Sequence, residues 1–178
     1  MVWAYRISRA KYSRSKKQIL SGKGAEMFGG RWNSPRRAVV YSSGSASLAT
    51  LEVIIHLNNP KVLHAYKIIE LEIPEDLIMP IDPTSLPVGW NALVVNPTNV
   101  QNWGNVWLDT QVSAVLEVPS VVTPGEFNYL INPVHPDFHQ IVKGKKKFLN
   151  SPKHHSPKNR QRIIGCVMPT SLKQVMHT

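Results

Sequence analysis

The sequence predicts a compact, single-domain α+β protein with mixed small sheets and short helices. The chain has 178 residues, 42% of them hydrophobic, which is the size and apolar content of one domain with a real core. Segments with strand patterns outnumber those with helical patterns. No repeated strand–helix–strand spacing occurs, and this absence favours α+β over a parallel α/β fold.

The first third of the chain alternates between strands, loops and one helix. Residues 2–8 alternate apolar and polar side chains as a strand does, whereas residues 9–23 are basic, serine-rich and ambiguous. Paired glycines and a proline make residues 29–35 a loop with unusual backbone angles. Residues 38–41 predict a short buried strand, followed by serines that can cap a helix running to about His56.

That helix is expected to bury one face. Leu48, Leu51 and Ile55 share this face, and Glu52 follows Leu48 by four residues. We therefore expect the Glu52 carboxylate at the edge of an apolar stripe.

The middle of the chain predicts further strands and a second helix. Residues 63–73 form a strand pattern between prolines, and residues 98–111 are helical in character although Gly104 weakens the pattern. Residues 112–122 are strand-like but contain Pro119, which requires a bulge or an exposed edge. Residues 127–131 predict another strand.

The net charge of +10 is unevenly distributed. Residues 1–37 and 143–178 each carry +9, whereas residues 38–142 carry −8. The lysine-rich run that begins at Lys143 is typical of a solvated tail, so we place a domain at residues 1–142 and a flexible basic tail at 143–178. The basic ends keep a nucleic-acid-binding module open as an alternative, but the acidic middle and the lack of interleaved aromatic residues argue against direct nucleic-acid binding.

Several functional classes are excluded by simple features. A single cysteine, Cys166, rules out an internal disulfide framework or a multi-cysteine metal site. No apolar run reaches 18 residues and no secretion signal precedes residue 10, so we expect a cytoplasmic protein without membrane contact. Neither a Rossmann fingerprint nor a Walker loop occurs, and Pro136 separates His135 from His139, so no metal site is expected.

A spaced set of motifs resembles the RES domain family over residues 2–142. The set consists of Gly30-Arg31-Trp32-Asn33, Val40-Tyr41, Leu51-Glu52, Val118-Pro119-Ser120 and Asn128-x-x-Ile131-Asn132-Pro133-x-His135-Pro136. The arginine, glutamate and serine that give the family its name would be Arg31, Glu52 and Ser120. The resemblance ends near residue 142, where such domains usually finish after a short strand.

The resemblance implies a fold similar to the ADP-ribosyltransferase toxins, with NAD as a substrate rather than a cofactor and with no metal. It also implies a bacterial toxin whose active site is covered by a helix-turn-helix antitoxin, with a homo-oligomer possible within that complex. The implied reaction breaks the nicotinamide–ribose bond. Phosphate or water accepts ADP-ribose in some members and a protein side chain in others, so a protein-modifying ADP-ribosyltransferase stays an alternative.

The residue types suit this chemistry. Nicotinamide leaves as a neutral ring and needs no proton donor, so a carboxylate such as Glu52 would stabilise an oxocarbenium-like ribose. Arginine binds phosphate oxygens in pairs, which makes Arg31 and Arg6 candidates for the pyrophosphate or an incoming phosphate.

Three further residues complete the candidate site. Tyr41 either stacks on the nicotinamide ring or is an ordinary core tyrosine. Ser120 lacks the surroundings of a triad nucleophile, so it either bonds to substrate or to Glu52, or only shapes the bulge at Pro119. Asn33, beside Arg31, is a candidate substrate-binding residue through the resemblance.

Overall fold

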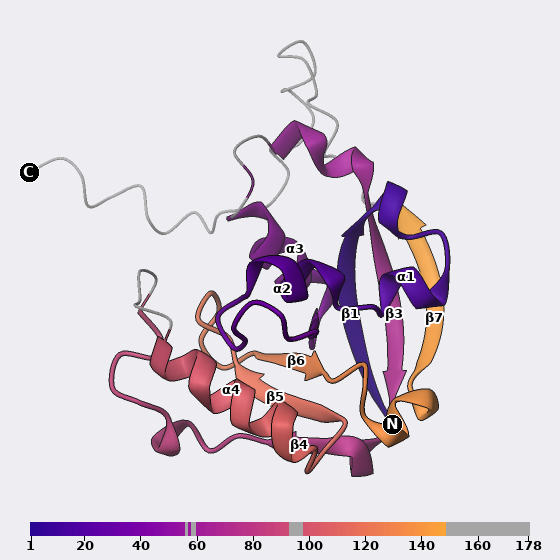
Figure 1. Cartoon of the computed structure of the whole chain (residues 1–178). Helices are drawn as coiled ribbons and strands as arrows, with labels where there is room; N and C mark the ends of the chain where they lie inside the picture. Colours follow the sequence, from indigo (N-terminus) through magenta and orange to yellow (C-terminus); the bar gives the residue numbers. More distant parts are fainter. Residues whose placement is uncertain (56, 58–59, 93–97, 149–178) are drawn as a thin grey trace, which may run out of the picture.

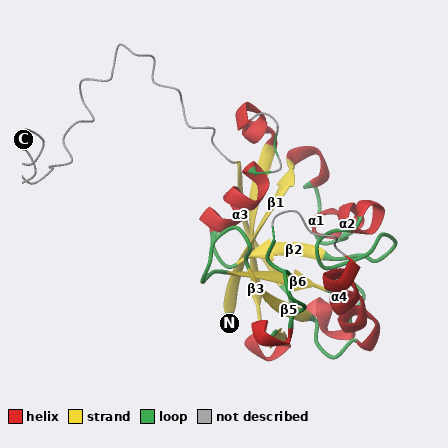
Figure 2. Ribbon diagram, turned by 90° about the vertical axis from the view of Figure 1, so that its left-hand side faces the viewer, coloured by secondary structure: helices red, strands yellow, loops and turns green. Residues whose placement is uncertain are grey.

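The computed structural model describes residues 1–148 except 56, 58–59 and 93–97. These residues form an α+β domain, as predicted, in which strands dominate and most helices are short (Figures 1 and 2). The strands are β1 (Val2–Arg9), β2 (Val40–Ser43), β3 (Tyr66–Ile73), β4 (Ile78–Pro80), β5 (Val115–Pro119), β6 (Phe127–Ile131) and β7 (Val142–Phe148). The helices are α1 (Lys16–Ile19), α2 (Lys23–Phe28), α3 (Ala46–Ile54) and α4 (Thr98–Thr110), with short 3-10 turns between elements.

The described strands join in one curled sheet with the order β4-β5-β6-β2-β1-β3-β7. Its two halves meet weakly, because β1 and β2 share the single pair Tyr5↔Ser43, whereas β1 and β3 pair along their full lengths. In Figure 1, β1, β3 and β7 run across the direction of β6. The mixed small sheets that we predicted are therefore two halves of one mixed sheet, joined by a single residue pair between β1 and β2.

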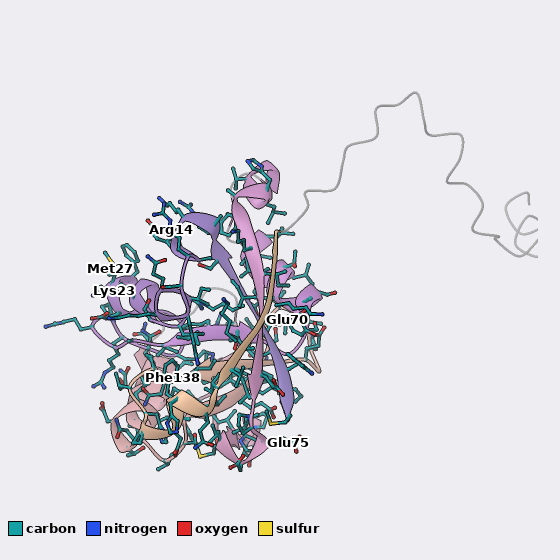
Figure 3. The ribbon with its side chains drawn as sticks, turned by 90° about the vertical axis from the view of Figure 1, so that its right-hand side faces the viewer. Arg14, Lys23, Met27, Glu70, Glu75 and Phe138 are labelled. Atoms are coloured by element: carbon teal, nitrogen blue, oxygen red, sulfur yellow. The ribbon has the colours of Figure 1, made fainter. Side chains whose placement is uncertain are left out.

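The core consists of two apolar clusters, of which the first joins the two halves of the sheet. The first packs residues of β1 and β3, including Ala4 and Leu71, with Ile131 of β6, and Phe138 packs against it (Figure 3). The second joins β5 and β6 to α4 through Leu116, Leu130 and Trp107. Within the described part of the chain, no helix has both the length and the apolar character needed to cross a membrane.

The loop at residues 29–35 lies directly against α4. Gln101 donates to the Gly30 carbonyl at 2.8 Å, and Asn105 exchanges hydrogen bonds with Ser34. Gly104 is the point of closest approach, since a Cβ built there would lie 1.8 Å from the Trp32 oxygen. The glycine that weakened the helix prediction thus permits this contact.

The lysine-rich run is a strand rather than the start of a tail. β7 pairs antiparallel with β3, for example Leu71↔Lys143, and forms an edge of the sheet. Lysines are common on edge strands because their charge discourages pairing with another chain. The tail prediction is therefore wrong for residues 143–148, and residues 149–178 lie outside the described part.

The predicted apolar stripe of α3 is also wrong. Ser45 caps the helix as expected, accepting from the Leu48 N–H at 3.0 Å. Leu48 is fully buried, but Leu51 and Ile55 are 43% and 51% exposed. The helix buries Leu48 and Ala49 instead, because it contacts β1 and β2 through that side.

Two strand boundaries differ from the sequence prediction. The first residues of the segment 63–73 belong to a 3-10 turn, Pro60–Ala65, so that β3 begins at Tyr66. Pro119 is the last residue of β5, and β4 ends opposite Glu117, so no β4 strand residue pairs with this proline. The expected open edge at the proline is confirmed.

Candidate active site

A cavity of about 250 Å³ lies where the two halves of the sheet separate. β1, β2, α3 and β6 all contribute to its wall. The lining residues are Tyr5, Arg6, Ile7, Tyr41, Ser42, Ser43, Ala49, Glu52, Val53 and Asn128. The cavity thus brings together Arg6, Tyr41 and Glu52, three of the residues that the sequence singled out.

The Glu52 carboxylate is held by one of its two oxygens. Asn128 Nδ2 donates to Oε1 at 2.7 Å, and Ser120 Oγ donates to the same oxygen at 3.1 Å. Among the described residues no hydrogen bond is made to Oε2. One oxygen is therefore anchored, while the other stays available to a ligand.

The hydrogen bonds around Ser120 orient its hydroxyl toward Glu52. Its Oγ accepts from the backbone N–H groups of Val122 and Thr123 at 3.0 and 3.1 Å, so its proton is directed to the carboxylate. The predicted bond to Glu52 is confirmed, and the same hydroxyl also closes the turn after Pro119. A serine hydroxyl has one proton to donate, so this arrangement orients the carboxylate.

Arg6 brings a positive charge to the cavity. Its guanidinium donates to the Tyr41 carbonyl at 2.8 Å across the gap where the β1–β2 ladder is interrupted. Its Nε is buried without a hydrogen bond, and no described carboxylate forms an ion pair with it. Desolvation lowers the pKa of Arg6 to about 10, so the side chain remains charged at neutral pH.

Tyr41 links the cavity wall to the loop at residues 29–35. Its hydroxyl donates to Asn33 Oδ1 at 2.7 Å and accepts from the Trp32 N–H at 3.2 Å. Burial raises the pKa of this hydroxyl well above its usual value, so that Tyr41 stays neutral. Both polar contacts of the hydroxyl are thus within the protein, and stacking on nicotinamide stays a prediction.

Arg31 and Asn33 do not line this cavity. Arg31 donates to the carbonyls of Trp90 and Ala92 at 2.9 and 3.2 Å, next to residues outside the described part. Asn33 is fully buried, and its amide nitrogen donates to three carbonyl groups around the loop, including those of Ala25 and Arg37. In this arrangement Asn33 shapes the loop, and its binding to substrate stays a prediction that the geometry does not support.

Asn128 is the site residue that sequence reasoning missed. It belongs to a motif that carried the family resemblance, but only its place in the sheet reveals its contact with Glu52. Its backbone pairs with Ser43 on one side and Val118 on the other. A polar side chain near the start of an otherwise mostly apolar strand was the available signal.

The described residues contain no cluster of three potential metal ligands among His, Cys, Asp and Glu. His135 and His139 make separate contacts, to the Gln111 and Pro136 carbonyls respectively.

Comparison with known proteins places the chain in a family. The RES domain model matches residues 4–150. The chain is 38% identical over 143 residues to "Toxin Res" of Photorhabdus laumondii, covering 80% of this chain and 89% of that protein. It is 40% identical over 138 residues to the "Prs ADP-ribosylating toxin" of a Sphingobium species, covering 75% and 85% respectively.

A solved structure shares the fold. The structure of the MbcT–MbcA toxin–antitoxin complex of M. tuberculosis includes a chain that matches with a TM-score of 0.69 and 21% identity. The match covers 84% of this chain and 85% of that one. At this identity the likeness supports the fold alone.

Proposed function

The chain belongs to the RES domain family, and on that premise we propose that it is the toxin of a toxin–antitoxin pair and that it consumes NAD. Relatives at 38% and 40% identity are named as toxins, one of them as an ADP-ribosylating toxin. ADP-ribosylation by definition uses an ADP-ribose donor, and NAD is the donor that the family resemblance implies. We expect the reaction in the cytoplasm, where NAD is abundant.

The observation that carries this proposal is the anchored carboxylate of Glu52 in a cavity that also contains Arg6. A carboxylate with one fixed oxygen and one open oxygen can stabilise positive charge that develops on a ribose. The cation of Arg6 can attract the negatively charged part of a dinucleotide. The pair therefore suits a substrate with a ribose next to a pyrophosphate.

In the proposed reaction, the bond between nicotinamide N1 and ribose C1′ breaks, and its electron pair moves to the ring nitrogen. The pyridinium becomes neutral nicotinamide, so no acid is required for the leaving group. Positive charge spreads over C1′ and the ribose oxygen and is stabilised by Glu52. The acceptor oxygen then bonds to C1′ and releases its proton.

The acceptor distinguishes two candidate activities. Phosphate or water would give phosphorolysis or hydrolysis and deplete NAD. The name of the Sphingobium relative favours protein ADP-ribosylation as the second candidate. Both use the same cavity and the same carboxylate, so product analysis is needed to separate them.

The decisive experiment is the release of nicotinamide from NAD by the purified, antitoxin-free protein, without added metal. Chromatography with mass spectrometry would identify free ADP-ribose, its phosphorylated form or a modified protein. We expect nicotinamide release, with stimulation by phosphate if phosphate is the acceptor. Intact NAD after incubation with folded protein, with phosphate and with a cell extract as the acceptor source, would contradict the enzymatic proposal.

The proposed partner is an antitoxin that blocks this cavity, because an NAD-consuming enzyme would otherwise harm its own cell. A carboxylate on the inserting segment would match the Arg6 guanidinium, which lacks an ion pair among the described residues. The helix-turn-helix character of that partner is part of the proposal and follows from the family resemblance.

A further inference from the structure

Glu52 Oε1 accepts two hydrogen bonds, one from a residue in a turn and one from a residue in a strand. Ser120 lies in a turn just beyond the end of β5, whereas Asn128 lies within β6, paired on both sides. The shorter of the two bonds comes from Asn128, at 2.7 Å compared with 3.1 Å. The residue with the more firmly held backbone thus makes the closer contact with the carboxylate.

The amide of Asn128 has a defined orientation. A carboxylate accepts hydrogen bonds but cannot donate them, so the nitrogen of the amide must face Glu52. This leaves Asn128 Oδ1 directed elsewhere, buried and without a donor among the described residues. A free buried acceptor is costly in a folded protein, which indicates that the amide is retained for its contact with Glu52.

We propose that Asn128 is a positioning residue for Glu52, which anchors Oε1 so that Oε2 is presented to the ribose of the substrate. This inference rests on the proposed function and adds a residue to it. The orientation of the Glu52 carboxylate should affect kcat more than it affects substrate binding. A misplaced carboxylate stabilises the charge of the transition state less well.

The contact between Asn128 and Glu52 can be tested by placing a second charge beside Glu52. Besides Glu52, the titratable side chains that line the cavity are Tyr5, Arg6 and Tyr41, and Glu126 accepts from Ser45 at the start of α3. The Asn128→Asp variant keeps the shape of the side chain but places a second carboxylate against Oε1. Two carboxylates at this distance cannot both ionise easily, so the pair should then retain one proton to higher pH than Glu52 does in the wild type.

The first measurement is the titration of the pair by NMR of ¹³C-labelled glutamate and aspartate, with Glu52→Gln to assign the Glu52 signal. In Asn128→Asp we expect one carboxyl group of the pair to titrate about one pH unit or more higher than Glu52 does in the wild type, and this rise should disappear when Glu52→Gln is added. Asn102→Asp, at an exposed position of α4, adds the same charge elsewhere and should leave the Glu52 midpoint unchanged. If neither carboxyl group of folded Asn128→Asp titrates higher, or if the rise persists in the Glu52→Gln background, the contact is overturned and the inference with it.

The second measurement is kinetic and does not depend on the folding of the aspartate variant. Asn128→Ala should lower kcat for NAD consumption by about tenfold or more while KM changes by less than about threefold. In a Glu52→Gln background the same substitution should have no further effect on kcat, because the residue acts through Glu52. A full additional loss in that background would overturn the positioning role.

The two proposals fail separately. If the wild-type protein releases no nicotinamide, the proposed function is wrong, whereas the NMR titration still reports on the contact between Asn128 and Glu52. If the wild-type protein is active and Asn128→Ala turns over NAD at the wild-type rate, the positioning inference alone is wrong.

Discussion

For the replacement of Gly104 by alanine, helix propensity and tertiary packing predict opposite changes in the free energy of unfolding. Gly104 lies inside α4, where alanine is favoured over glycine by about 1 kcal/mol. Helix propensity by itself therefore predicts a more stable protein. The sign of the measured change shows whether the contact between α4 and the loop at residues 29–35 exists.

The close contact between Gly104 and Trp32 determines how large the loss of stability should be. A Cβ at position 104 would lie 1.8 Å from the Trp32 carbonyl oxygen and 2.9 Å from its carbon. Non-bonded atoms pack at about 3.5 Å, so helix and loop would have to separate by on the order of 1.5 Å. Overpacking costs up to about 3 kcal/mol, and rigid backbone places this case at the upper end. After the gain of about 1 kcal/mol in propensity, we expect a net loss of about 2 kcal/mol in the free energy of unfolding.

Urea unfolding followed by circular dichroism provides the assay, with Gly24→Ala as the control. Gly24 is also helical, in α2, but a Cβ there would meet nothing within 4 Å. That variant should be stabilised by up to about 1 kcal/mol. If Gly104→Ala were as stable as the wild type or more so, the close approach of α4 to Trp32 would be refuted.

Four further predictions concern the site. Glu52→Gln should remain folded, since it keeps the size of the side chain, and lose activity by roughly 10²–10³, as measured by nicotinamide release; full activity would refute its role. Arg31→Lys keeps the charge but loses the planar fork that binds phosphate oxygens in pairs, so we expect a higher KM for NAD in steady-state kinetics; an unchanged KM would argue against a substrate-binding role. The raised pKa of Tyr41 contributes stability below the unfolded value near 10, which is lost as the pH rises. The free energy of unfolding should therefore fall more steeply with pH above about 10 in the wild type than in Tyr41→Phe, and identical slopes would contradict this linkage. Expression of the chain alone should slow growth, co-expression with a neighbouring helix-turn-helix protein should restore it, and truncating the inserting end of that protein should abolish rescue while the complex still forms. Normal growth with abundant soluble protein and no partner would contradict the toxin proposal.

Local signals in the sequence determined much of the fold. The strand at residues 127–131, the loop at 29–35 and the Ser45 cap of α3 all follow from alternation, glycine placement and capping chemistry. These features depend on neighbouring residues, so they can be predicted without knowing what packs against them. The family resemblance singled out Ser120, a bond to substrate or to Glu52 was expected, and the hydrogen bond to Glu52 is present.

Other features of the fold and the site depend on contacts between segments that are far apart in the sequence. Which face of α3 is buried depends on its contact with β1 and β2, so Leu51 is exposed although its spacing fits an apolar stripe. Lys143 begins a run that has the composition of a solvated tail, yet its backbone pairs with Leu71 of β3. Asn128 meets Glu52 from 76 positions away along the chain. Hydrogen bonds between strands and across a cavity join residues that no local pattern connects, and for that reason tertiary structure was needed to assemble the site.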